Sequence, residues 1–109
     1  MLDDGDLLLP IEVVPMGDDL VTVFVRGEID LTEAGELRAV LGDACSDAHR
    51  SVVVDLSGVG FMGSRGLGVL AHQHKQMADA GRALMIVGCS AAMLRAFAIT
   101  GLDRVLDVS

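Results

Sequence analysis

Two short apolar runs constrain the fold of this chain more than any other feature. Residues 52–56 read Val-Val-Val-Asp-Leu, and residues 83–87 read Ala-Leu-Met-Ile-Val. Short runs of this kind are typical of strands buried within a sheet. The stretch between them predicts a helix, because one face carries Leu67, Leu70, Ala71, His74, Met77 and Ala78. A strand–helix–strand order predicts two parallel strands joined by a crossover helix that packs on the sheet.

The flanking segments extend this unit on both sides. Asp30, with Glu33 three residues later, predicts a capped helix whose apolar stripe is Leu31, Ala34, Leu37, Val40, Leu41 and Ala44. Ser90 predicts the start of a last helix and Gly101 its end. The other expected strands are residues 7–14, 20–26 and 105–108. The order predicts an α/β domain with a mixed sheet of four to five strands and about three helices.

The length and the net charge of the chain limit the number of domains and the kinds of partner that we expect. The 109 residues argue for one domain over residues 1–109, with residues 1–6 as a flexible acidic N-terminus. Net charge is −8, which disfavours nucleic acid and suits a basic protein partner. An acidic N-terminus without a long apolar run predicts no signal peptide and no membrane span. Cys45 and Cys89 lack metal-ligand or disulfide-framework spacing, so we expect two thiols in the cytoplasm.

A glycine-rich stretch raises the question of a cofactor. Gly58, Gly60 and Gly63 spell the G-x-G-x-x-G pattern of dinucleotide-binding loops. The following strand ends without the acidic residue that would hold a ribose, and Phe61 and Met62 place bulk in the stretch. A small nucleotide-binding domain is therefore a remote alternative, and we expect no cofactor. We also expect no metal site, because His72 and His74 are two residues apart on a helix and point to different sides.

Ser64 is the most informative single residue. It lies between Gly63 and Gly66 at the expected start of the second helix, where serine is a good N-cap. The glycines leave its hydroxyl uncrowded, so a kinase could reach it. A helix N-terminus also tolerates an added phosphate. The sequence thus predicts either a structural cap or a phosphorylation switch at Ser64, and it offers no base for a catalytic serine.

Four segments in order resemble one family. They are residues 27–30 (Gly-Glu-Ile-Asp), 54–62, 64–70 and 97–102 (Phe-Ala-Ile-Thr-Gly-Leu). Together they resemble the STAS domains of bacterial anti-sigma factor antagonists. The resemblance implies helices packed mainly on one side of the sheet. It implies a non-enzymatic regulator of transcription that acts in partner switching and the stress response. Such a protein binds an anti-sigma factor, usually an ATP-dependent serine kinase, and so releases a sigma factor.

The resemblance also assigns roles to residues. It implies that Ser64 is the phosphorylation site, that phosphorylation ends binding, and that a serine phosphatase resets the cycle. It implies that Glu28 and Asp30 contact the partner from the strand-to-helix junction. It places a further group of partner-binding residues on the helix that follows the serine: Gly66, Leu67 and Val69. Homodimerisation stays open.

The chain departs from the family pattern on both sides of the serine. Gly63 stands where aspartate is common, and Arg65 stands where serine or threonine is common. We count both among the partner-binding residues. Arg65 either pairs with a phosphate on Ser64 and mutes the switch, or meets an acidic patch on the partner. The departures also keep open an alternative function, a constitutive STAS scaffold that is not phosphorylated.

Overall fold

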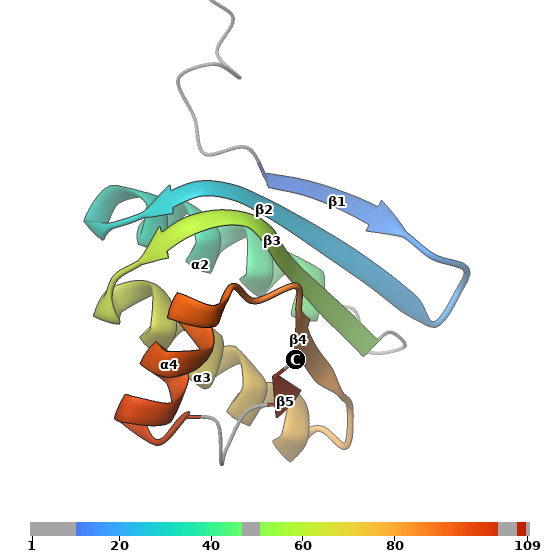
Figure 1. Ribbon diagram of the computed structural model, residues 1–109. Coiled ribbons are helices and arrows are strands. Elements are labelled where there is room, and N and C mark those ends of the chain that lie inside the picture. Colours follow the sequence, from blue (N-terminus) through green and yellow to red (C-terminus); the bar gives the residue numbers. More distant parts are fainter. Residues whose placement is uncertain (1–10, 47–50, 103–106, 109) are drawn as a thin grey trace, which may run out of the picture.

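A five-stranded mixed sheet forms the frame of the molecule (Figure 1). The computed structural model describes residues 11–46, 51–102 and 107–108. The strands are β1 (Ile11–Pro15), β2 (Leu20–Ile29), β3 (Ser51–Met62), β4 (Leu84–Val87) and β5 (Asp107–Val108). The helices are α2 (Leu31–Cys45), α3 (Ser64–Asp79) and α4 (Ala91–Thr100).

The strands lie in the sheet in the order of the sequence, β1-β2-β3-β4-β5. β1 pairs antiparallel with β2 through a turn in which Gly17 has a φ of 87°. The remaining neighbours are parallel, as α2 and α3 cross from one strand to the next. Residues 7–10 and 105–106, which the sequence places in the first and last strands, lie outside the described residues.

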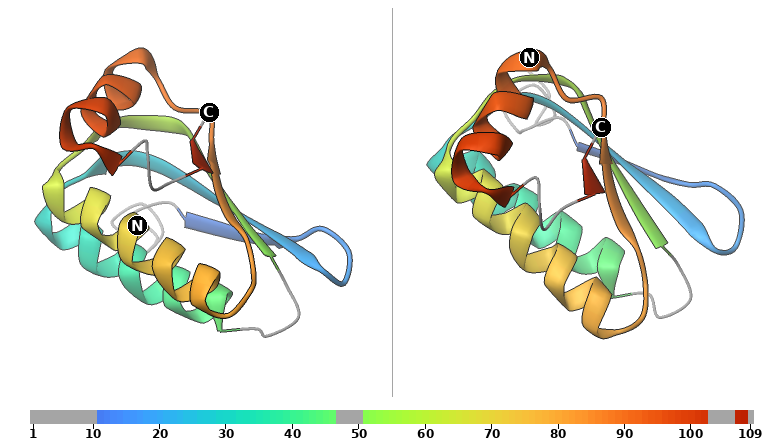
Figure 2. Two further views of the ribbon diagram at one scale, coloured as in Figure 1. Left: turned by 90° about the horizontal axis from the view of Figure 1, so that it is seen from below. Right: turned by 60° about the horizontal axis from the view of Figure 1, so that its bottom comes forward.

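All three helices of the described residues lie on one face of the sheet (Figure 1). That face buries alternate residues of the two central strands, Val21, Val23, Val25, Val52, Val54 and Leu56. The helices meet them with Leu37, Leu41, Leu70, Met77 and Phe97. α2 and α3 run side by side along the sheet (Figure 2). The small α/β fold expected from the sequence is confirmed.

The two central strands are longer than predicted. β2 continues to Ile29 and β3 to Met62, with pairs Arg26↔Gly58 and Ile29↔Met62. Two irregularities in the register, of the kind that β-bulges produce, lie between Phe24 and Arg26 and between Gly27 and Glu28. The pairing continues across them, so the glycine-rich stretch extends the sheet.

This result removes the nucleotide-binding alternative. The glycines at 58 and 60 lie within β3, and neither has a positive φ. A Cβ atom at Gly58 would collide with Cγ of Arg26, whose side chain lies over that glycine. The dinucleotide interpretation needs a turn that cradles phosphate, and a paired strand occupies its place. That interpretation is wrong.

Most predicted helix ends are confirmed. Asp30 and Glu33 form a capping box, in which the Asp30 backbone N–H donates to Oε1 of Glu33 at 3.1 Å. Oγ of Ser90 accepts a hydrogen bond of 3.2 Å from the Met93 backbone N–H. Gly101 ends α4 with a φ of 78°, a conformation that glycine adopts without strain.

Candidate functional site

The ends of β2 and β3 bring the starts of two helices to one edge of the sheet. Because the strands are parallel and paired to their last residues, α2 begins beside α3. The Gly63 backbone N–H donates a hydrogen bond of 2.9 Å to the Ile29 carbonyl oxygen. A Cβ atom at Gly63 would lie 3.7 Å from Oδ1 of Asp30. The strand-to-helix junction and the serine segment, which are distant in sequence, are therefore neighbours.

The sequence predicted Ser64 as the N-cap of α3, and that prediction is wrong. Gly63 occupies the N-cap position in an extended conformation, and Ser64 is the first residue inside the helix. The Gly63 carbonyl oxygen accepts the first hydrogen bond of the helix, 3.1 Å from the Leu67 backbone N–H. The Ser64 side chain is exposed and makes no hydrogen bond within the described part of the chain. Its hydroxyl is therefore accessible and has no structural role in capping.

Gly66 and Leu67 are buried, which differs from the expectation that the helix presents them to a partner. A Cβ atom at Gly66 would lie 2.6 Å from Cγ of Met62 and 2.9 Å from Cγ2 of Ile29. The first turn of α3 thus packs closely against both strand ends. Both residues face the interior, where they hold the helix against the strand ends, and they offer almost no surface to a partner.

Two exposed apolar side chains lie at the same edge, and sequence patterns did not single them out as functional. Leu31 is 60% exposed at the start of α2, although its spacing placed it on the apolar stripe. Phe61 is 51% exposed near the end of β3. Its Cε2 atom would lie 3.7 Å from a Cβ atom at Gly63. The one available signal was a bulky aromatic residue in a glycine-rich stretch.

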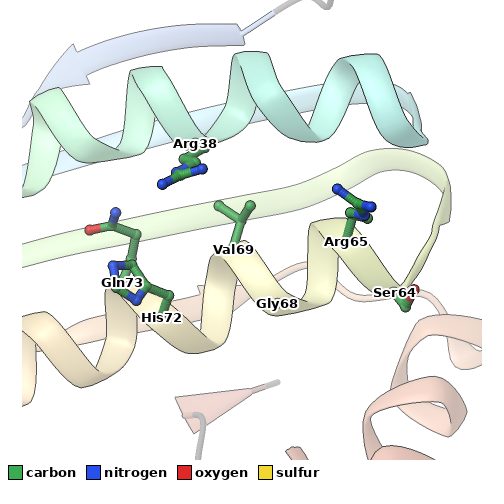
Figure 3. A pocket seen from close by; sticks show the side chains of 7 residues that line it. All are labelled: Arg38, Ser64, Arg65, Gly68, Val69, His72 and Gln73. Carbon is green, nitrogen blue, oxygen red and sulfur yellow. The ribbon is translucent and has the colours of Figure 1, made fainter.

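A groove of about 480 Å³ runs along the seam between α2 and α3 (Figure 3). Its lining consists of Arg38 from α2 and, from α3, Ser64, Arg65, Gly68, Val69, His72 and Gln73. Arg38 and Arg65 point into the space between the helices, whereas the Ser64 side chain points away from α2 (Figure 3). Arg65 and Ser64 are sequence neighbours whose side chains diverge.

The other features considered in the described residues are metal-ligand clusters, the two cysteine thiols and membrane-spanning helices. No three histidine, cysteine or acidic side chains in the described residues gather as they would around a metal ion. Burial raises the pKa of Cys45 to about 11 and raises the pKa of Cys89 as well, so both thiols are protonated at neutral pH. None of the helices in the described segments has the length and apolar character that a membrane crossing requires.

Comparison with known proteins identifies the family. The model of the STAS domain matches residues 13–109. This chain belongs to the STAS domain family. It is 35% identical over 92 residues to an anti-sigma-B factor antagonist of Staphylococcus aureus, which covers 84% of this chain and 85% of that protein. It is 30% identical over 100 residues to the protein of that name from Listeria monocytogenes, covering 92% and 88%.

A solved structure is similar over nearly the same length. The crystal structure of an anti-sigma factor antagonist from Mycobacterium paratuberculosis superposes with a TM-score of 0.79 and 32% sequence identity. The match covers 90% of this STAS chain and 84% of the other chain.

Proposed function

We propose that this STAS protein is an anti-sigma factor antagonist, which binds an anti-sigma factor and thereby frees a sigma factor in the cytoplasm. The relatives of that name support the proposal, because they match this chain over most of both lengths. The observation that carries the mechanism is the exposed, unbonded Ser64 hydroxyl at the edge where α2 and α3 begin.

The partner docks on the surface around Ser64, which we call the junction surface: Glu28, Asp30, Leu31, Phe61, Gly63, Ser64 and Arg65. Leu31 and Phe61 supply exposed apolar area of the kind that anchors protein interfaces. Glu28 and Asp30 are exposed carboxylates beside it. A mixed apolar and charged surface suits a protein partner better than a small substrate.

Phosphorylation of Ser64 ends the interaction. A phosphate adds about 1.5 to 2 negative charges at the junction surface. The helix N-terminus tolerates this charge, so the domain stays folded. A phosphate about 4 Å from a partner carboxylate costs roughly 1 to 4 kcal/mol, or one to three decades of affinity. The anti-sigma factor itself acts as the ATP-dependent serine kinase, and a serine phosphatase restores binding.

One observation favours a second candidate, a constitutive STAS module. Gly63 removes an acidic side chain next to the serine, and Arg65 adds a basic one. A kinase that recognises an acidic flank would act poorly on this segment. In that case the same surface binds a partner without any switch.

A pull-down from lysate of the source organism tests the proposal. The baits are the wild type, Ser64→Glu and the control Ser46→Glu, which adds the same charge at an exposed serine past the far end of α2. We expect wild type and Ser46→Glu to retain a histidine-kinase-like ATPase, and Ser64→Glu to retain much less. Equal retention by all three baits would support the constitutive module. Retention by none would contradict both.

A further inference from the structure

We propose that the groove between α2 and α3 binds an acidic segment of the anti-sigma factor, with Arg38, Arg65 and Gln73 as the residues that hold its carboxylates. The inference rests on the proposed function, because it names the chemistry of that partner. It extends the proposed partner-binding surface from the junction surface along the groove between α2 and α3.

The groove is basic in an acidic protein. Arg38 and Arg65 line it together with His72, and none of its lining residues is acidic, although the chain carries a net charge of −8. Both arginines are exposed, and neither forms an ion pair within the described residues, where Lys75 and Asp79 form one at 3.3 Å. A guanidinium presents paired N–H donors that match a carboxylate. The groove therefore offers two unused carboxylate-binding groups.

Gln73 adds a second, independent feature. The residue as a whole is 9% exposed and lines the groove, and its side chain makes no hydrogen bond within the described part of the chain. It points into the space between the helices (Figure 3). No side-chain nitrogen or oxygen atom of the described residues is both buried and without a hydrogen-bond partner, so the Gln73 amide is reachable from the groove. A carboxylate lying in the groove would accept a hydrogen bond from it.

The position of the groove indicates its occupant. Ser64 lines one end, so a partner on the junction surface lies at the mouth of the groove. The net negative charge of this chain attracts a basic partner. The basic groove next to the junction surface then favours the one orientation of that partner in which an acidic segment enters the groove. An acidic segment of the partner that docks on the junction surface meets both conditions, because it lies at the mouth of the groove and carries the complementary charge.

Charge reversal tests this inference. The variants are Arg38→Glu and Arg65→Glu, and the control is Arg95→Glu, which makes the same change at an exposed arginine of α4 outside the groove. The probe is the ATPase retained by the wild-type bait, purified and measured by biolayer interferometry. We expect both groove variants to weaken binding by about 10- to 100-fold, mainly through slower association, and the control by less than about 3-fold.

The salt dependence gives a second readout. Exposed charges are screened at high ionic strength, so the difference between wild type and Arg38→Glu should shrink between about 50 mM and about 300 mM salt. Groove variants that bind within about 2-fold of wild type at low salt would overturn the groove proposal and leave the proposed function standing. Failure of wild type to retain any such ATPase would overturn both.

A small anion is the competing occupant. Inorganic phosphate and succinate are titrated against the wild type and Arg38→Glu, with the melting temperature as readout. We expect neither anion to raise it at micromolar concentration. A saturable rise that Arg38→Glu abolishes would make the groove a small-anion site and overturn the proposal.

Discussion

The Gly63 backbone N–H and the Ile29 carbonyl oxygen form a hydrogen bond of 2.9 Å that joins the ends of β2 and β3. Gly63 caps α3, and Ile29 immediately precedes the cap of α2. This bond therefore fixes the two helix starts relative to each other. It also places Gly63, the residue before the exposed Ser64, next to Asp30.

Gly66→Ala should destabilise the protein by about 1 to 3 kcal/mol, because a methyl group there would overlap Met62 and Ile29. Gly68→Ala is the matched control on the same helix, since nothing lies within 4 Å of its added Cβ. It should be neutral or stabilising by up to about 1 kcal/mol. Urea unfolding followed by circular dichroism measures both. Equal stabilities would contradict the close packing of α3.

Ser64→Ala should leave stability within about 0.5 kcal/mol of wild type, because Ser64 makes no cap hydrogen bond. Ser90→Ala, by contrast, removes the bond to the Met93 N–H and should cost about 0.5 to 2 kcal/mol. Thermal unfolding of the two variants side by side checks the difference. A loss at Ser64 as large as that at Ser90 would mean that the serine has a structural role after all.

Asp30→Ala should destabilise α2 by about 0.5 to 2 kcal/mol through loss of its cap. We also expect weaker binding to the anti-sigma factor at a temperature where the variant is fully folded. Surface-immobilised binding, with folding checked by circular dichroism, separates the two effects. Unchanged affinity would restrict Asp30 to a structural role.

Arg65→Ser tests whether this arginine mutes the switch. Because the Arg65 and Ser64 side chains diverge, we expect phosphorylation to weaken binding by the same factor in Arg65→Ser and in wild type. The unphosphorylated variant should already bind more weakly. Titrations of the four species measure both ratios. A markedly larger phosphorylation effect in Arg65→Ser would show that Arg65 neutralises the phosphate.

The raised pKa of the buried Cys45 thiol predicts a loss of stability at alkaline pH. Burial raises its folded-state pKa from 9.0 to about 11. Between these values the unfolded thiol releases its proton while the folded one keeps it, so stability falls as pH rises through this window. Urea unfolding across it should show a shallower fall in Cys45→Ala than in wild type. Parallel curves would contradict the buried, neutral thiol.

The sequence predicted the fold well because its strongest signals are local. The apolar run at 52–56 lies in β3, and the run at 83–87 contains all of β4. The caps at Asp30 and Ser90 lie where the spacing placed them. The site was predicted less completely. The cap of α3 is Gly63 and not Ser64, and the Gly63 N–H is bonded to Ile29 at the end of the paired strands β2 and β3. Tertiary pairing of this kind leaves no mark in local periodicity.

The groove could not be predicted from local sequence patterns either. Arg38 and Arg65 are distant in sequence and share a site only because parallel strands bring α2 and α3 side by side. Leu31 matched the apolar spacing of its helix, yet it lies in the first turn at the edge of the sheet and stays exposed. Helical periodicity shows which face is apolar and does not show where the partner layer ends.

Phosphorylation of Ser64 by the bound anti-sigma factor tests the central claim most directly. Wild type and Ser64→Ala are incubated with the purified ATPase and ATP, and the modified residue is mapped by mass spectrometry. Affinity is then measured with a labelled protein, since the chain has no tryptophan or tyrosine. We predict one phosphate on Ser64 of wild type, none on Ser64→Ala, and an affinity about 10- to 1,000-fold lower after modification. Phosphorylation of Ser64→Ala to the same extent, or unchanged affinity of the modified wild type, would contradict the account.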